Sequence, residues 1–312
     1  MNKSAETKKY MPLVGAAGIG SMLGSGIIIG LSATITVWQS GLGLTDGQVG
    51  ILSGALTFAI AAGSLLAGNI TKLFGLIRSF NMMNLMYLIG AAICVLSGNF
   101  PVLLAGLIIT GFASGADLPI SLTVISHDAP NEKVSASLIA STQVFWQIGV
   151  LGSYAMAFIV SHVEGAAGAR MVFALLAVLA GIAFVWRTFS KKFKEFHAAG
   201  DEYRAAEGTK TSTEVSFASL FKGTDGKKYV SFFSCIIIFY VCWNLLANTF
   251  GQFQTYILVK ANASQSLATG CGIILNIVGL ICGILFASAA GSKHRNKFFY
   301  VGIVIQAGAM IG

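Results

Sequence analysis

Eight long apolar runs, separated by short polar turns, dominate this sequence and limit the folds open to it. A helix that crosses a bilayer needs about 20 mainly apolar residues, and inside lipid the backbone must satisfy its own hydrogen bonds. Hydrophobic residues make up 55% of the chain and charged residues 10%, whereas soluble domains carry about 25% charged residues. We therefore expect an all-α polytopic helical membrane protein, with spans over residues 13–38, 49–74, 82–96, 101–126, 136–160, 171–186, 229–256 and 267–290.

The spacing of these runs predicts three regions. Residues 1–188 form a six-helix bundle, and residues 229–312 form part of a second bundle with two full spans and a partial ninth span that starts at Phe298. Residues 189–228, rich in Lys, Glu, Ser and Thr, form a linker with a short amphipathic helix around residues 217–221. Because the ninth run stops at Gly312 after too few residues to cross a bilayer, we expect the chain to be a piece of a longer protein.

The basic residues set the orientation. Of the 20 Lys and Arg residues, 18 precede the first span or lie in alternate connections, the linker included, and only Arg170 and Lys260 lie on the other side. Loops rich in Lys and Arg stay in the cytoplasm, so we expect a multi-pass protein of the plasma membrane (the inner membrane of a bacterium) with a cytoplasmic N-terminus. The net charge of +8 is then a topology signal, and no nucleic-acid partner is expected.

The residue types that intramembrane enzymes need are missing from the expected spans. The five cysteines are scattered, with no CxxC or Cys/His cluster that would indicate a disulfide framework or a metal site. The sequence has no HExxH, no GxSxG elbow, and no second carboxylate within a span that could pair with Asp117 as in an aspartyl protease. We expect no enzyme activity, no cofactor and no metal.

Asp117 is the only one of the twelve Asp and Glu residues that lies deep inside an apolar run. A carboxylate at this depth costs about 2.5–3.5 kcal/mol on insertion scales, so it is rarely incidental. No Lys or Arg is expected at membrane depth, and a carboxyl group buried without a cation can take up and release a proton. Asp117 is therefore predicted to be the proton-coupling group; the alternative is an Asp that only bonds a neighbouring helix.

Amide side chains recur at helical spacing on later spans. Amides both donate and accept hydrogen bonds and Trp offers a flat apolar face, a combination that suits a sugar or polyol near the membrane midplane. The alternative is hydrogen bonding between helices, which Asn and Gln also provide. The predicted substrate-binding residues are Gln143, Trp146 and Gln147 on the fifth span, Asn244, Asn248 and Gln252 on the seventh, and Asn276 on the eighth.

Two motifs resemble those of the major facilitator superfamily. Gly68-xxx-Lys72-xx-Gly75-xx-Arg78 is similar to the family signature between spans two and three. Gly115-Ala-Asp117-Leu-Pro119-Ile-Ser121, followed by Asp128-Ala-Pro130 and Lys133, resembles the G-x-D-Y-P-L-S…E-x-x-P-x-x-x-R-G pattern of its sugar, phosphate and organic-acid proton symporters. The resemblance implies two six-helix halves around a midplane site. It also implies a conformational role for Gly68, Lys72, Gly75, Arg78, Asp128 and Lys133.

Taken together, the sequence predicts a monomeric secondary active transporter. It would import a small sugar-like or polyol-like metabolite by proton symport with alternating access, sodium being the other candidate ion. The absence of an expected intramembrane cation favours neutral solutes, because an anion would need a positive partner. The alternatives are a proton symporter for an organic anion or phosphate, and a transporter-like nutrient sensor that binds its solute without moving it.

Overall fold

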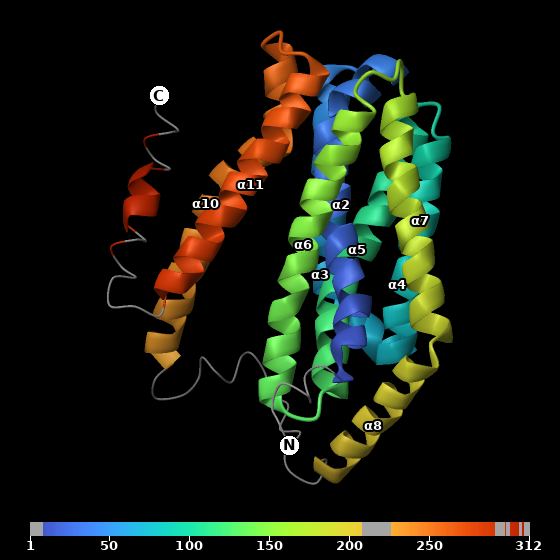
Figure 1. Cartoon of the computed structure of the whole chain (residues 1–312), viewed down its shortest axis with the longest axis vertical. Helices are drawn as coiled ribbons and strands as arrows, with labels where there is room; N and C mark the ends of the chain where they lie inside the picture. The colour runs from blue at the N-terminus through green and yellow to red at the C-terminus, as the bar shows by residue number, and fades with distance from the viewer. Residues whose placement is uncertain (1–8, 208–225, 291–296, 298–299, 306–307, 309–312) are drawn as a thin grey trace.

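The computed structural model describes residues 9–207, 226–290, 297, 300–305 and 308, and the regular structure of these residues is helical throughout (Figure 1). Seven of the described helices are long and apolar enough to cross a membrane, which confirms the predicted fold class. Helices extend past the predicted apolar runs at many ends. Their bounds are α2 (Met11–Leu42), α3 (Asp46–Phe74), α4 (Leu76–Leu96), α5 (Phe100–Asp128), α6 (Glu132–Ile159), α7 (Ala167–Phe189), α8 (Lys191–Glu207), α10 (Gly226–Lys260) and α11 (Gln265–Ala290).

Helices α2 to α7 pack into one bundle with α2 at its centre (Figure 1). Helix α2 packs against α5, α6 and α7, while α3 and α4 pack on α5. Small residues permit these close approaches: a Cβ atom at Gly115 of α5 would overlap the carbonyl of Ile60 on α3. Small residues at such helix contacts are typical of membrane proteins, where they let the backbones of neighbouring helices approach.

The helix connections define two ends of the molecule. The α3–α4 turn at Gly75, with φ of 84°, and the α5–α6 turn lie at the end where α8 sits, which we call the α8 end. The α2–α3, α4–α5, α6–α7 and α10–α11 turns lie at the other end, which we call the opposite end (Figure 1). The α2–α3 turn is fixed by a capping box in which Thr45 and Gln48 bond each other's backbone N–H groups.

Helix α8 occupies a stretch that was expected to be linker. Its composition is polar, but Phe193, Phe196, His197 and Gly200 recur at spacings of three and four residues and form a narrow inward face. Phe196 packs on Tyr10, and both Phe193 and Phe196 are buried. The amphipathic helix predicted around residues 217–221 lies outside the described residues, and the three predicted regions remain a prediction.

Helices α10 and α11 run beside the first bundle but meet it mainly toward the opposite end. Helix α10 contacts α2, and α11 contacts α6. Toward the α8 end the two helices diverge from α6 (Figure 1), and the apolar side chains of Phe232, Ile236 and Ile238 on α10 are exposed there. The interface between the two helical units is therefore concentrated at one end of the molecule.

Candidate functional site

Asp117 lies inside the first bundle and is bound by Arg187 of α7. The exposed fraction is 3% for Asp117 and 2% for Arg187. Both terminal nitrogens of the guanidinium donate hydrogen bonds to the carboxylate: Nη1 lies 2.5 Å from Oδ1 and Nη2 lies 3.1 Å from Oδ2. The hydroxyl of Ser121 adds a donated hydrogen bond to Oδ2 at 3.3 Å. Such a bidentate pair is the strongest geometry that a carboxylate and an arginine can form.

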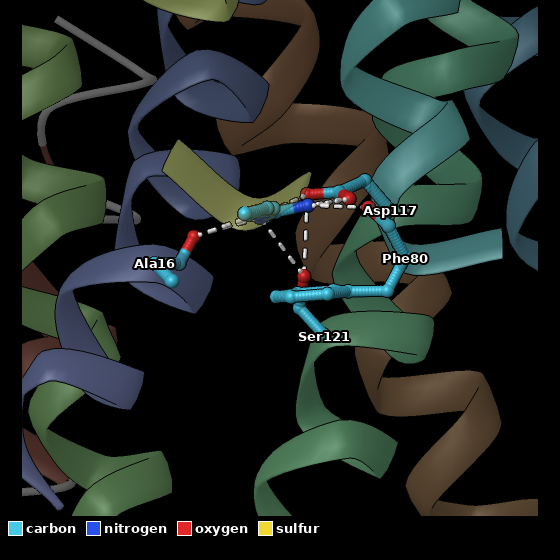
Figure 2. Close-up of polar contacts among 5 residues, drawn as sticks. Ala16, Phe80, Asp117 and Ser121 are labelled. Carbon is cyan, nitrogen blue, oxygen red and sulfur yellow. Dashed lines mark hydrogen bonds and ion pairs between the residues drawn. The ribbon is translucent and has the colours of Figure 1, made fainter. Parts of the chain in front are cut away.

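The remaining donors of Arg187 bind backbone carbonyls of two further helices (Figure 2). Its Nε and Nη2 donate to the carbonyl of Ala16 on α2 at 3.0 and 2.8 Å, and Nη1 donates to the carbonyl of Phe80 on α4 at 2.9 Å. The guanidinium also lies over the Phe80 ring, 3.9 Å from its centroid. When the side-chain amide of Asn84 is rotated so that its O and N atoms exchange places, its oxygen accepts from Nε and Nη1 of Arg187 at 3.0 and 2.9 Å. The ion pair thereby ties α2, α4, α5 and α7 together.

Gly20 of α2 provides the space for this pair. A Cβ atom at Gly20 would overlap Oδ2 of Asp117 and would lie 2.8 Å from Nη2 of Arg187. Both atoms are held by their own hydrogen bonds, so neither side chain can give way cheaply. The absence of a side chain at position 20 is therefore a requirement of the buried ion pair.

The expectation that no cation lies at membrane depth is wrong. Arg187 directly follows the last residue predicted for the sixth span and was therefore expected in the linker. In the structure, α7 continues to Phe189, and the side chain of Arg187 is buried in the bundle. Helical side chains point back toward the N-terminus of their helix, which carries the charge of Arg187 inward. Ala16, Phe80 and Arg187 all lie within two turns of an α8-end helix terminus, so the pair sits nearer that end than the midplane.

The predicted amide residues lie on three helices. On α6, Gln143 is exposed and Trp146 and Gln147 are half-buried. On α10, the amide of Asn248 donates to the side chain of Asn244, which donates in turn to the carbonyl of Tyr240 at 2.8 Å. On α11, half-buried Asn276 donates to the carbonyl of Gly272 at 2.8 Å. Among these described side chains, no hydrogen bond joins the amides of α6 to those of α10 or α11, so their shared role stays a prediction.

The third amide of the α10 set, Gln252, belongs to a polar contact zone between the two units. Its side-chain Nε2 donates to the backbone carbonyl of Ser53 at 3.2 Å, and its backbone carbonyl accepts from the hydroxyl of Ser32 at 2.6 Å. Gln265 of α11 accepts from Thr36 at 2.6 Å and donates to the carbonyl of Ala33 at 2.7 Å. We call this zone the seam; its residues are Ser32, Ala33, Thr36, Ser53, Thr57, Gln252 and Gln265, with the pairs Asp46–Lys260 and Ser161–Ser266 at its rim.

The motif residues divide between exposed and buried positions. Lys72 and Arg78 are exposed on either side of the α3–α4 turn, where Gly75 supplies the positive φ. Gly68 is exposed with open space around it, and the side chain of Lys133 lies outside the described part of the chain. Asp128 is completely buried and bonds two histidines, His127 and His197. The conformational role of the motif stays a prediction.

The partners of both buried carboxylates are not predicted from the sequence. Arg187 and His197 lie 70 and 69 residues away from Asp117 and Asp128, so no local pattern links them. The signal that was available for Arg187 is a single basic residue directly after an apolar run. The signal for His197 is its place on the narrow inward face of α8. In the described part of the chain, no group of three or more His, Cys, Asp or Glu residues could hold a metal ion.

Comparisons with known proteins add the family context. The sequence model of the Major Facilitator Superfamily matches residues 14–312. The minor myo-inositol transporter IolF of Bacillus subtilis (strain 168) is 30% identical over 292 residues, which cover 91% of this chain and 64% of that protein. The D-xylose-proton symporter-like 2 of Arabidopsis thaliana is 26% identical over 153 residues, which cover 48% of this chain and 30% of that protein. The chain therefore spans less than two thirds of the length of either relative.

Solved structures show the same fold. A partially occluded inward-open form of the xylose transporter XylE from E. coli matches with a TM-score of 0.68 at 14% identity, over 92% of this chain and 74% of that chain. A crystal structure of a D-xylose-proton symporter matches with a TM-score of 0.66 at 15% identity, over 91% of this chain and 69% of that chain. These proteins bear the names of transporters and symporters and not of enzymes, which agrees with the expectation that the chain is no enzyme.

Proposed function

The chain belongs to the Major Facilitator Superfamily, as its motifs predict. On this premise we propose that it forms part of a secondary active transporter for a small neutral polyhydroxylated solute. The multi-pass helical fold and the sugar and inositol transporters among its relatives support this class of function. Alternating access requires two units that meet at one end of a central path and separate at the other. The arrangement of α10 and α11 against the first bundle has this property.

The seam is the observation on which the proposal rests. Its hydrogen bonds run between side chains and carbonyls of α2 and α3 on one side and of α10 and α11 on the other. They are individually modest, about 0.5–1.5 kcal/mol each in net terms, so the seam can open and close during a transport cycle. The two units meet at the opposite end, and the proposal takes the α8 end as the side from which a solute would leave.

The substrate class follows from the amides beyond the seam. Gln143, Gln147, Asn244, Asn248 and Asn276 offer donors and acceptors without a formal charge. Relatives named for myo-inositol, D-xylose and a polyol carry solutes of this chemistry. Because Arg187 is already neutralised by Asp117, it offers no free positive charge to an organic anion or phosphate.

Proton coupling at Asp117 takes a changed form once Arg187 is its partner. A proton on the carboxyl group would remove half of a buried ion pair, and leaving a buried charge unpaired costs several kcal/mol. Protonation would therefore accompany a rearrangement of α2, α4, α5 and α7, the helices that Arg187 ties together. In this scheme the proton is taken up during the transport cycle and not at rest.

The α8 end is proposed to face the cytoplasm. Lys72, Arg78 and the Lys and Arg residues of α8 lie there, whereas Arg170 and Lys260 lie at the opposite end. Positive residues favour the cytoplasmic side. The closed seam then faces outward, and the state described is the one that would release a solute to the cell interior.

The test is flux in proteoliposomes that contain the purified protein. Radiolabelled myo-inositol and D-xylose are each offered with and without an inward proton gradient, beside phosphate and a dicarboxylate as charged competitors. We expect uptake of a polyol or sugar that is accelerated by the proton gradient and unaffected by either anion. Uptake of an anion in preference to the neutral solutes would overturn the substrate assignment.

A transporter-like sensor is the remaining alternative, and the same vesicles separate it from a transporter. A sensor binds the solute without moving it. Solute-dependent thermal stabilisation of the protein in detergent, together with no counterflow in vesicles, would support the sensor and would contradict transport.

A further inference from the structure

The imidazole of His127 lies between two carboxylates that belong to different helices. Its Nδ1 is 2.8 Å from Oδ1 of Asp128 on α5, and its Nε2 is 3.3 Å from Oδ1 of Asp201 on α8. A neutral imidazole has one N–H donor and one acceptor nitrogen, whereas a charged imidazolium has two donors. The contact to Asp128 is a hydrogen bond that Nδ1 can donate in either charge state, whereas the contact to Asp201 is a charge contact that attracts only when the ring carries a second proton.

His197 has the opposite requirement, although it bonds the same aspartate. Its Nδ1 lies 2.6 Å from Oδ2 of Asp128, while its Nε2 is buried and has no hydrogen-bond partner. The residue is 8% exposed, with the edge of its ring against Phe80 of α4. A second proton on His197 would bury an N–H group without an acceptor, which is unfavourable. The neutral form, with Nδ1 as donor, fits this environment, so the two histidines have different roles.

Asp201 is the exposed member of the group and His127 is partly open to solvent. The exposed fraction of the side chain is 76% for Asp201 and 20% for His127, against 0% for Asp128. Solvent protons can therefore reach His127 without unfolding of the helix. Of the other charged groups on α8, Arg204 donates to the carbonyl of Ser126 on α5 at 2.6 Å. Directly before α2, Tyr10 packs on Phe196, with Lys9 over the Tyr10 ring.

Gly200 brings α8 close enough for these contacts. A Cβ atom at this position would lie 2.8 Å from Nδ1 of His127 and 2.9 Å from Oδ1 of Asp128. The helix therefore approaches α5 at the one place where both polar atoms must be reached. The fit of Gly200 and the pairing of His127 with Asp201 are separate features that hold the same two helices together.

We propose that His127 is a proton-binding site that clamps α8 onto the end of α5. With a proton on both ring nitrogens, His127 bridges Asp128 and Asp201 and holds α8 in place. Without the second proton, Nδ1 still donates to Asp128, but the ring has no charge to attract Asp201 and the bridge to α8 opens. Because α8 precedes α10 in the chain, the proposal includes that the clamp limits the movement of the second unit relative to the first.

The consequence for transport rests on the proposed function. If protons enter the cell with the solute, acid accumulates at the α8 end, closes the clamp and slows the movement between the units. The clamp then acts as a brake on import when the cytoplasm turns acidic. The position of α8, however, can be measured without any solute, so the two proposals fail independently.

The direct test is the distance between α8 and the first bundle as a function of pH. Spin labels are placed by Ala205→Cys on α8 and Leu73→Cys on α3, both exposed, in a variant with the native cysteines replaced. Histidine generally changes charge between about pH 5 and pH 8, so the distance distribution is recorded at about pH 5.5 and about pH 8.5. We expect one narrow distance at acid pH and loss of that peak at alkaline pH.

Variants at the same position give the controls. His127→Arg should keep the narrow peak at both pH values, because a guanidinium donates to both carboxylates regardless of pH. His127→Gln and Asp201→Asn should each show the broad distribution at both values, and His162→Gln, at an exposed site of the opposite end, should behave like the parent protein. A parent peak that does not change with pH, or a change that persists in His127→Arg, would overturn the clamp.

A second measurement reports on transport itself. In vesicles that show flux, acidifying the α8 side should slow counterflow in the parent protein and should leave His127→Gln unaffected. A parent rate that is insensitive to pH on that side, while the label distances respond, would overturn the brake and leave the clamp in place. Loss of flux in every variant would speak against the proposed function and not against the clamp.

Discussion

Asp117 and Asp128 lie 11 residues apart on one helix, and both are buried, yet their partners differ in kind. Asp117 is paired with a guanidinium that stays charged at any physiological pH. Asp128 is bonded by two imidazoles, of which His197 fits the neutral form and His127 is the proposed proton-binding group. In the two proposals, the first site changes its charge only when the helices rearrange, whereas the second responds to protons at rest. The comparison therefore proposes Asp117 for the transport cycle and Asp128, through His127, for regulation.

The largest effect is expected from removing the cation at Asp117. Arg187→Gln leaves a buried carboxylate unpaired and should lower the stability of the protein by about 3–5 kcal/mol, measured as a drop in the thermal unfolding temperature in detergent. The double variant Asp117→Asn/Arg187→Gln should recover a large part of this loss, because no charge remains buried. A single variant as stable as the parent would show that the pair does not hold the four helices.

The next effect concerns the space around the ion pair. Gly20→Ala places a methyl group against Asp117 and Arg187 and should cost about 1–3 kcal/mol by overpacking. Gly54→Ala on α3 is the matched control, since a Cβ atom there would meet nothing within 4 Å. The same thermal unfolding assay checks both. Equal unfolding temperatures for the two variants would contradict the tight fit at Gly20.

A smaller and more local effect is expected at the second carboxylate. Gly200→Ala introduces a Cβ atom against His127 and Asp128, which should separate α8 from α5 and leave the six-helix bundle folded. Limited proteolysis should then cut α8 faster than in the parent protein, with little change in the unfolding temperature. Unchanged cleavage would mean that α8 tolerates the added methyl group and is not fitted closely to α5.

The smallest effect is expected for a third carboxylate, Asp46, whose pair with Lys260 lies on the surface at the rim of the seam. The Asp46 and Lys260 side chains are 3.1 Å apart but largely exposed, and such pairs contribute little to stability. Lys260→Gln should leave the unfolding temperature within error of the parent value at both low and high salt. A clear destabilisation at low salt would place the rim pair among the structural contacts of the seam.

The sequence predicted the exceptional carboxylate but not its partner. Asp117 is visible because it interrupts an apolar run, a local signal that needs no tertiary information. The same rule does not identify Arg187, because a basic residue at the end of a span is normally assigned to the adjoining loop. Only the orientation of α7 in the bundle shows that its side chain points inward. The histidine contacts of Asp128 require the position of α8, a helix whose polar composition predicts linker. Local pattern therefore gave the spans, and the long-range pairs came only from packing.

The amide residues show the same limit from another side. Spacing predicts one α10 face for Asn244, Asn248 and Gln252, but spacing cannot say which unit each amide meets. In the structure Gln252 reaches α2 and α3, whereas Asn244 and Asn248 bond along their own helix. Their binding of a solute remains a prediction, which the flux experiment with Asn248→Ala would sharpen.

The most direct measurement compares two transport modes in the folded double variant Asp117→Asn/Arg187→Gln. Counterflow of the solute needs no net proton movement, whereas accumulation driven by a proton gradient does. If Asp117 carries the coupled proton, the variant should retain counterflow and should no longer concentrate the solute when the gradient is applied. Accumulation equal to that of the parent protein would contradict the assignment of the proton to Asp117.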